Sequence, residues 1–117
     1  MIAGKPTLAH VIGCPAGVAP ELSARMLADA DLNAEARIIV IGDARILAYG
    51  AKTAGVTVNL PTIGEHDPIP PGDGPRLIDQ PRLDAADIRI GQLAKPHCDA
   101  AMSNFRKALD LARHGQV

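Results

Sequence analysis

The sequence predicts an α/β domain in which helices cover both faces of a mostly parallel sheet, giving three layers. The run of β-branched residues from Arg37 to Ile41 has no apolar-polar alternation, which is typical of a parallel strand buried on both faces. Apolar runs and helical patterns also alternate along the chain, the order expected for β-α-β units with right-handed crossovers. Hydrophobic residues make up 47% of the 117 residues and aromatic residues only 2%, so Ala, Leu, Ile and Val must fill the interior.

The first element is a strand that leads through a glycine-containing loop into a helix. The apolar run Leu8 to Ile12 predicts the strand, and Pro20 suits the first turn of a helix from about Glu21 to Ala30. Its expected apolar face is formed by Leu22, Met26 and Leu27. We expect this face to pack in the core, and the alternative is a surface for a partner.

The loop between these elements, residues 13–17, is a candidate ligand site. A glycine loop before a helix N-terminus leaves backbone N–H groups free at the carboxyl edge of a sheet, where an anion can be held. The alternative is that the glycines only let the chain turn. The residues themselves favour neither interpretation.

The next helix is predicted from its two ends. Asp43 follows the buried strand and is a natural N-cap for a helix from about Ala44 to Ala54, which Gly55 would end. An aspartate there can instead bind a ribose hydroxyl in dinucleotide-binding folds. The sequence lacks G-x-G-x-x-G, so the N-cap is the simpler interpretation and a Rossmann assignment is disfavoured. Val56 to Leu60 is predicted to be a third strand.

From Pro61 to Pro75 the chain is predicted to have no regular structure, because the segment holds five prolines and three glycines in fifteen residues. We expect an exposed loop, and the alternative is a rim over a cleft or against a partner subunit. Arg76 to Asp79 is compatible with a short strand, and Pro81 to Ile90 is expected to be irregular.

The last predicted element is an amphipathic helix that starts near Pro96 and ends at Gly115. Its apolar residues recur at intervals of three and four, namely Met102, Phe105, Ala108, Leu109 and Ala112. Since the sequence stops at Val117, where a further strand is expected, we predict an unpaired sheet edge and a partly uncovered apolar face on this helix. Both features favour self-association.

Composition excludes several classes of function. Lys and Arg number 12 against 13 Asp and Glu, and no basic run occurs, so nucleic acid and anionic membranes are not expected partners. No apolar stretch approaches the roughly 20 residues of a membrane helix, and residues 1–13 lack the features of a signal peptide. We therefore expect a cytoplasmic protein. Cys14 and Cys98 have no C-x-x-C spacing and are expected to be free thiols.

No residue set in the sequence predicts a catalytic or metal site. The four histidines, His10, His66, His97 and His114, form no pattern typical of metal ligands. His10 lies within the first strand, and we expect a hydrogen-bonded imidazole. Cys14 precedes a helix N-terminus, which can lower a thiol pKa and make it reactive, but no partner base is near in sequence. An unreactive thiol is the favoured interpretation, and Cys98 is given no role.

The segment GCPAGVAPE, residues 13–21, resembles the signature G-[DE]-P-A-G-I-G-P-E of the 4-hydroxythreonine-4-phosphate dehydrogenase family. The matching positions are Gly13, Pro15, Ala16, Gly17, Pro20 and Glu21. Cys14 stands where the family has an acid, and Ala19 stands where it has glycine. The resemblance continues in Arg37 to Leu47 and in Gly91 to Ala112, so it extends along essentially the whole chain.

This resemblance implies that residues 1–117 form the N-terminal α/β portion of a larger two-domain enzyme, with part of the isocitrate/isopropylmalate dehydrogenase-like fold. Such an enzyme oxidises a small phosphorylated hydroxy acid, with decarboxylation, using NAD or NADP and a divalent metal. The metal-binding half of the family lies downstream of the point where this sequence stops. We therefore expect no dehydrogenase activity from the 117-residue chain alone.

The resemblance also implies a homodimer with a histidine contributed by the partner subunit, and it places Gly13, Cys14, Ala16 and Gly17 at the cofactor. Two alternatives stay open. One is a related dehydrogenase acting on sugar-acid phosphates or aromatic dihydrodiols, and the other is a truncated module that binds a ligand or partner without catalysis.

Overall fold

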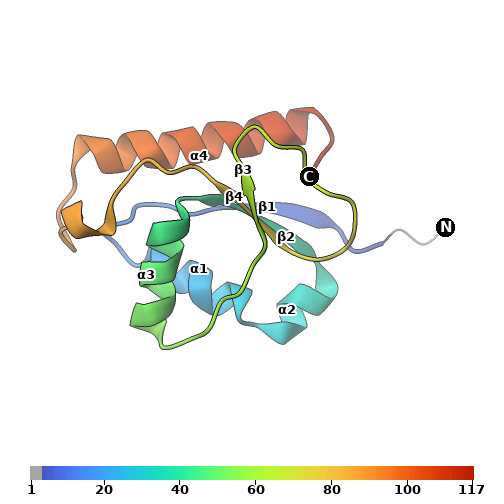
Figure 1. Ribbon diagram of the computed structural model, residues 1–117, viewed down its shortest axis with the longest axis horizontal. Coiled ribbons are helices and arrows are strands. Elements are labelled where there is room, and N and C mark those ends of the chain that lie inside the picture. Colours follow the sequence, from blue (N-terminus) through green and yellow to red (C-terminus); the bar gives the residue numbers. More distant parts are fainter. Residues whose placement is uncertain (1–3) are drawn as a thin grey trace.

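The computed structural model describes residues 4–117, except for the side chain of Ala85. Its elements follow one another along the chain as shown in Figure 1. They are β1 (Thr7–Val11), α1 (Ala19–Leu27), α2 (Ala30–Glu35), β2 (Arg37–Gly42), α3 (Ala44–Ala54), β3 (Thr62–Gly64), β4 (Arg76–Asp79), the 3-10 turn η1 (Ala85–Asp87) and α4 (Lys95–Arg113).

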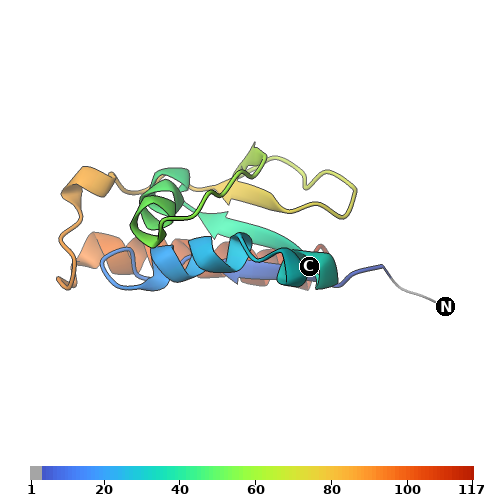
Figure 2. The same ribbon diagram turned by 90° about the horizontal axis from the view of Figure 1, so that it is seen from below.

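The four strands form one parallel sheet in the order β1-β2-β4-β3. Leu8 lies opposite Ile38 and Val11 opposite Ile41, which confirms that the first two predicted strands are parallel neighbours. Helices α1 and α3 lie on one side of the sheet and α4 on the other, as Figures 1 and 2 show together. The predicted three-layer α/β fold is therefore confirmed.

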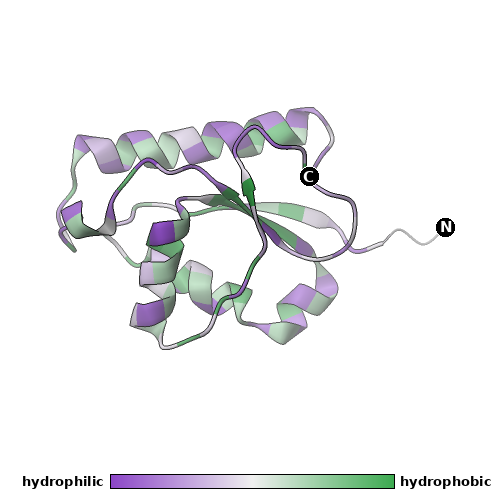
Figure 3. Cartoon of the chain, in the orientation of Figure 1, coloured by the Kyte–Doolittle hydropathy of each residue, from purple (hydrophilic) through white to green (hydrophobic). Residues whose placement is uncertain are grey.

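Strand β2 is the centre of the core, and all six of its residues are buried. Successive side chains of a strand point to opposite faces. Ile38 and Val40 accordingly join the cluster under α1 and α3, while Ile39 and Ile41 join a smaller cluster with Leu111 of α4. Figure 3 shows the central strands as the most hydrophobic part of the chain.

Helix α3 forms as predicted. The Asp43 carboxylate accepts a hydrogen bond from the Arg45 N–H at 3.0 Å, and Gly55 ends the helix in the left-handed conformation with φ of 70°. Packing against α1 depends on Gly50, since a Cβ placed there would overlap the Pro20 carbonyl group. Glycine is thus required where these two helices approach most closely.

The first helix differs from its prediction. It ends at Leu27 instead of Ala30, because Asp29 adopts an extended conformation and caps a separate helix, α2. The Asp29 carboxylate accepts hydrogen bonds from the N–H groups of Asp31 and Leu32 at 2.9 and 3.2 Å. Leu22, expected on the buried face, is 57% exposed, whereas Leu27 is buried.

The predicted third strand is wrong. Val56 to Leu60 is not a strand, although its half-buried and exposed residues alternate as in an extended chain. The third strand is instead β3, inside the segment predicted to have no regular structure, and it pairs with β4. Alternating burial shows that a segment lies against a core, but strand formation also needs a hydrogen-bonding neighbour.

Helix α4 covers the second face of the sheet with an unusual set of residues. Its buried residues are His97, Ala100, Asn104 and Leu111. Met102, Phe105 and Leu109 are 48%, 48% and 55% exposed, which confirms the prediction of a partly uncovered apolar face. Among the described residues, no helix has the length and apolar character needed to cross a membrane.

Candidate functional site

The glycine loop lies where the carboxyl ends of the parallel strands meet. After β1, the Ile12 N–H donates to the Ile41 carbonyl at 3.1 Å, which keeps the chain beside the last residues of β2 before it turns. The Gly17 N–H donates to the Cys14 carbonyl at 3.3 Å, and the Ala16 carbonyl accepts from the Gly91 N–H at 2.8 Å. The loop is therefore fixed both within itself and to the segment that precedes α4.

The glycines of this loop are not needed for a left-handed backbone, because neither Gly13 nor Gly17 has positive φ. A Cβ at Gly13 would lie 3.3 Å from the Ala19 Cβ, a tight contact, whereas one at Gly17 would meet only the Cys14 carbonyl oxygen at 3.8 Å. Gly17 is exposed. Its lack of a side chain leaves the surface of the loop open to a bound group.

The four residues predicted at the cofactor do not share one cavity. Ala16 and Gly17 line a recess of about 260 Å³ between the loop, α1 and α3. Its other lining residues are Val18, Pro20, Glu21, Tyr49, Thr53, Ile90 and Gly91. Gly13 faces a much smaller recess under α4, and Cys14 lines neither of the two.

The start of α1 forms one wall of the larger recess. Val18 at the N-cap position makes no side-chain hydrogen bond to the helix end, and Pro20 lies in the first turn, as predicted. The first N–H groups of a helix have no partner within the helix and carry its positive dipole end. An anionic group beside residues 16–18 would be stabilised there.

Asp43 connects three parts of the edge of the sheet. Its carboxylate caps α3, bonds the Arg45 side chain at 3.1 and 2.9 Å, and accepts from the N–H groups of Arg82 and Leu83, both at 3.0 Å. Burial alone would raise the pKa of Asp43, but the hydrogen bonds from Arg45 and Leu83 outweigh burial and hold the pKa below its ordinary value. This carboxylate is occupied by the fold, which supports its interpretation as a cap.

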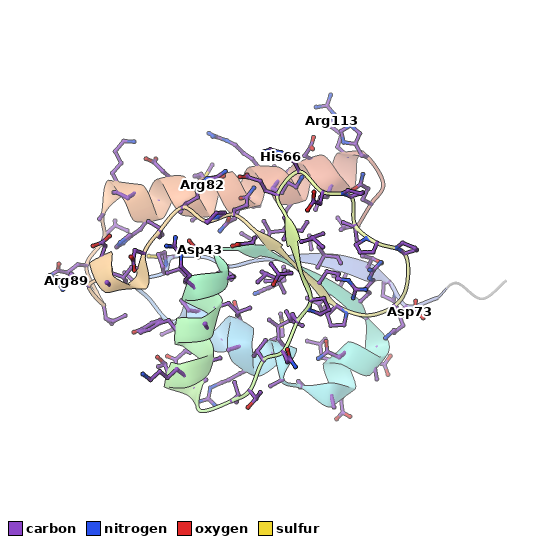
Figure 4. All side chains as sticks on the ribbon, viewed as in Figure 1. Asp43, His66, Asp73, Arg82, Arg89 and Arg113 are labelled. Carbon is purple, nitrogen blue, oxygen red and sulfur yellow. The ribbon has the colours of Figure 1, made fainter. Side chains whose placement is uncertain are left out.

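Two further carboxylates at this edge also have structural bonds. Asp79, at the end of β4, accepts from the Ala44 N–H at 2.9 Å. Glu65, just after β3, accepts from the Arg82 guanidinium at 3.1 and 2.7 Å, and these bonds hold the pKa of Glu65 below its ordinary value. Figure 4 shows Arg82 between the start of α3, where Asp43 lies, and α4.

Polar side chains are buried beneath α4 at the same edge. Asn104 donates to the Ile12 carbonyl at 3.3 Å, and Ser103 donates to the Gln80 side-chain oxygen at 3.3 Å. The Asn104 Oδ1 and His97 Nδ1 atoms are buried without a protein partner. Asn104, Gln80 and Gly13 line the smaller recess, whose volume of about 10 Å³ is near the lower limit for holding one water molecule.

Sequence reasoning missed this second group of residues. Asp79, Gln80 and Arg82 reach the edge only because β4 lies next to β2, and the sequence gives no local sign of that order. Asp79 was the one that could be found, because it is the last residue of a predicted short strand. Nothing in the sequence around Asn104 and His97 indicates that these two residues lie at this edge of the sheet.

The histidines do not belong to any cluster of possible metal ligands among residues 4–117. In the described part of the chain, no three or more His, Cys, Asp or Glu residues lie close enough together to hold a metal ion. His10 lies 2.8 Å from the Ser23 hydroxyl, as expected for a hydrogen-bonded imidazole, and burial lowers its pKa. His66 is exposed in the proline-rich segment.

These features define a class of protein. A parallel sheet covered by helices on both faces, with a glycine loop and a helix start at its carboxyl edge, is typical of α/β proteins that bind ligands outside their strand ends. No protein-family model matches the chain. Known proteins do match it, in sequence and in structure.

The chain is 41% identical to a protein of Rhizobium meliloti provisionally named 4-hydroxythreonine-4-phosphate dehydrogenase 2, over 97% of this chain and 33% of that protein. It is 30% identical to a protein of Symbiobacterium thermophilum provisionally named D-threonate 4-phosphate dehydrogenase, over 97% of this chain and 34% of that protein. The chain thus spans about a third of the length of these relatives.

Solved structures of proteins with the same name also resemble this chain. The 4-hydroxythreonine-4-phosphate dehydrogenase of Burkholderia phymatum superposes with a TM-score of 0.82 at 28% identity, over 98% of this chain and 35% of that one. The enzyme of that name from Klebsiella pneumoniae gives a TM-score of 0.74 at 25% identity, over 100% of this chain and 36% of that one. The resemblance to the 4-hydroxythreonine-4-phosphate dehydrogenase family is therefore confirmed along the whole chain.

Proposed function

We propose that this chain is the N-terminal α/β portion of a dehydrogenase that oxidises a small phosphorylated hydroxy acid, with decarboxylation, using NAD or NADP and a divalent metal. The observation that carries the proposal is the 41% identity to the Rhizobium meliloti relative over 97% of this chain. The match includes the glycine loop, which the structure places at the carboxyl edge of the sheet.

In this proposal the loop contributes to holding the cofactor. Backbone N–H groups near residues 16–18, other than that of Gly17, which donates to the Cys14 carbonyl, would contact a phosphate. The recess beside Ala16 and Gly17 offers apolar walls and the Tyr49 ring to the rest of the ligand. When bound, a nicotinamide cofactor accepts the hydride removed from the substrate hydroxyl. The chain's own role is to bind and orient it.

The metal does not fit the residues of this chain, because the described part of it offers no cluster of suitable donor side chains. We place the metal ligands in the two-thirds of the relatives that the chain does not span. The homodimer and the partner histidine belong to the same proposal, and they rest on the family resemblance alone.

The first experiment addresses the loop. Adding inorganic phosphate or NAD to the 117-residue chain should shift the amide resonances between Gly13 and Glu21, with an affinity that falls as salt screens the charge. Gly17→Val should abolish the shifts by blocking close approach to the backbone. Gly4→Val is the matched control, because Gly4 has no atom within 4 Å of an added Cβ. Unmoved resonances between residues 13 and 21 would show that the loop is only a turn.

The second experiment addresses catalysis. A chimera in which this chain replaces the corresponding third of the Rhizobium meliloti relative should reduce NAD in the presence of a divalent metal and substrate, whereas the 117-residue chain alone should not. Activity of the isolated chain would contradict the proposal that the metal ligands lie outside this chain. An inactive but folded chimera would favour a truncated binding module, the alternative suggested by Cys14 and Ala19 in the signature.

A second candidate substrate is D-threonate 4-phosphate. The relatives from Symbiobacterium thermophilum and Clostridium botulinum are named for it, and they match 97% and 100% of this chain at 30% identity. Both named substrates are phosphorylated hydroxy acids. Comparing the rates of the chimera with the two substrates would show whether this third of the enzyme contributes to substrate specificity.

A further inference from the structure

The amino edge of the sheet, where the strands begin, holds a buried cation without an ion pair. Arg37 is the first residue of β2 and is 7% exposed. In the part of the chain that the structure describes, Asp43 is the other buried charged side chain, and it pairs with Arg45 at 2.9 Å. No carboxylate among residues 4–117 lies within 4 Å of the Arg37 guanidinium. A buried charge of this kind is costly unless an opposite charge meets it.

The proline-rich segment between β3 and β4 holds the Arg37 guanidinium in place. The Nε–H of Arg37 donates to the Gly74 carbonyl and its Nη2–H to the Pro70 carbonyl, both at 2.7 Å. These neutral carbonyl groups orient the guanidinium but leave its net charge uncompensated. A guanidinium also has more N–H donors than these two bonds use.

A second arginine begins the neighbouring strand on the same face of the sheet. Arg76 of β4 lies opposite Ile39, and Ile39 shares its face with Arg37 because side chains two residues apart on a strand point the same way. The Nη1–H of Arg76 donates to the carbonyl of Pro75 at 2.8 Å. Since Pro75 follows Gly74 directly, the two guanidinium groups bind adjacent peptide groups. Two cations placed so close together repel each other unless an anion lies near.

An open recess lies beside Arg37. Its volume is about 330 Å³, and its lining residues are Arg37, Pro68, Ile69, Pro70, Pro71 and Gln116. Figure 1 shows the segment between β3 and β4 passing beside the end of the chain that follows α4. Arg37 and Gln116 are the lining residues whose side chains can donate hydrogen bonds. The recess therefore gives a hydrogen-bond acceptor access to the buried cation.

The acidic side chains around this edge do not neutralise the two arginines. Asp67 accepts from the Gly64 N–H at 2.9 Å, and Asp110 lies 3.5 Å from the His114 ring, with both groups exposed. Asp73 is exposed in the segment between β3 and β4, as Figure 4 shows. The nearby C-terminal end of α4 carries only a partial negative charge.

We propose that Arg37, with Arg76 beside it, forms an anion site that takes a carboxylate or phosphate group at the amino edge of the sheet. A guanidinium suits both groups, because its N–H groups can donate two parallel bonds to two oxygens. The anion neutralises the buried charge and relieves the repulsion between the arginines. It is either free in solution or a carboxylate from the two-thirds of the relatives that this chain does not span. The glycine loop lies at the opposite edge of the sheet, so this site does not depend on cofactor binding there.

Titration of the chain with anions tests the site. The C terminus should be amidated, so that the Val117 carboxylate cannot act as the anion. Inorganic phosphate and acetate should each shift the Nε–H resonance of Arg37, whereas the glycine loop responds at residues 13–21. Arg37→Lys keeps the charge but loses the planar pair of donors, so phosphate affinity should fall about tenfold or more. In this variant the Gln116 side-chain amide and the Nε–H of Arg76 report binding.

A second variant keeps the test valid if a change at Arg37 disturbs the proline-rich segment. Arg76→Met leaves both bonds of Arg37 in place, because Arg76 bonds the residue before it, and it should weaken phosphate binding several-fold. The matched control is Arg89→Met, at an exposed arginine that Figure 4 shows far from Asp73, and it should leave the affinity unchanged. An Arg37 resonance that responds to neither anion would overturn the proposal. Equal affinities in the Arg76→Met and Arg89→Met chains would do the same.

The chimera with the Rhizobium meliloti relative identifies the source of the anion. If phosphate still shifts the Arg37 resonance in the chimera, the site takes a free anion. If that resonance already lies at the position of the acetate-bound chain and phosphate does not move it, a carboxylate from the rest of the enzyme fills the site. A resonance that stays at the anion-free position and does not respond would contradict an anion site in the complete enzyme.

Discussion

The two faces of the sheet are covered in different ways. On one face α1 and α3 pack so closely that only glycine fits at position 50, over a large cluster of buried aliphatic side chains. On the other face α4 lies alone over a small cluster, buries His97 and Asn104, and leaves Met102, Phe105 and Leu109 half exposed. Apolar side chains that point to solvent contribute little to folding, whereas those in a closed core contribute most of the stability. We infer that the α1 and α3 face stabilises the fold and that the α4 face is available for contacts.

The largest expected effect is at Gly50. Gly50→Val should destabilise the chain by about 3 kcal/mol or more, or prevent folding, because the new side chain would overlap the Pro20 backbone. Ala48→Val, at an exposed position of the same helix, should cost only about 0.5 kcal/mol through helix propensity. Denaturant unfolding of the two variants measures the difference. Equal losses would show that the packing of α1 on α3 is not as close as described.

Two leucines of α4 offer a matched test of the second face. Leu111 is 4% exposed and Leu109 is 55% exposed. Leu111→Ala should cost about 2–4 kcal/mol, as for other buried leucines, and Leu109→Ala less than about 1 kcal/mol. Unfolding should be measured at low protein concentration, where any association through the exposed apolar residues of α4 does not add to stability. A larger loss at Leu109 would contradict the assignment of the buried face.

Asp43 tests the edge that joins the two faces. Its pKa is lower in the folded chain, so it stabilises the fold above the ordinary aspartate pKa, and this contribution is lost as the pH falls toward the folded value. Asp43→Asn should cost about 2 kcal/mol at neutral pH, because buried N–H groups lose a charged acceptor. It should also flatten the fall in stability in acid. Asp73→Asn, in the exposed loop, is the control and should leave the stability at neutral pH unchanged.

The smallest expected effect concerns His10. Burial lowers the pKa of His10, so the unfolded chain binds a proton more readily than the folded chain, and stability should decrease as the pH falls below about 6.5. In His10→Gln this decrease should be smaller between about pH 7 and pH 5. Thermal unfolding across that range measures it, and an identical pH dependence in both chains would show that His10 does not titrate as described.

The elements that could be predicted from sequence are those fixed by local chemistry. Asp43 and Gly55 bound α3 as expected, because an N-cap and a left-handed glycine act on the residues beside them. The β-branched run of β2 was also sufficient to predict a buried strand. Helix α2 was missed, although Asp29 caps it by the same chemistry, because the prediction extended the first helix over its start.

The wrong predictions concern which segments of the chain lie next to each other in the fold. Val56 to Leu60 has the composition of a strand, but β4 takes the place beside β2 and pairs with Thr62–Gly64 instead. The bonds from Arg82 to Glu65 and to Asp43 depend on the same strand order. For α4, the apolar spacing predicts a helix correctly but cannot tell which of two adjacent apolar faces meets the sheet.

The insertion of β4 between β2 and β3 has a consequence for how the chain folds. The pairing of β1 with β2 and the packing of α1 on α3 involve only residues up to Gly55, so this half can form from contacts that are near in sequence. The sheet is completed only when residues 76–79 return past the proline-rich segment, and Asp43 then receives the N–H groups of Arg82 and Leu83. Closing a loop of this length costs entropy before its contacts form. We therefore expect a folding order in which the first half of the chain is the template and β4 is the strand that closes the sheet.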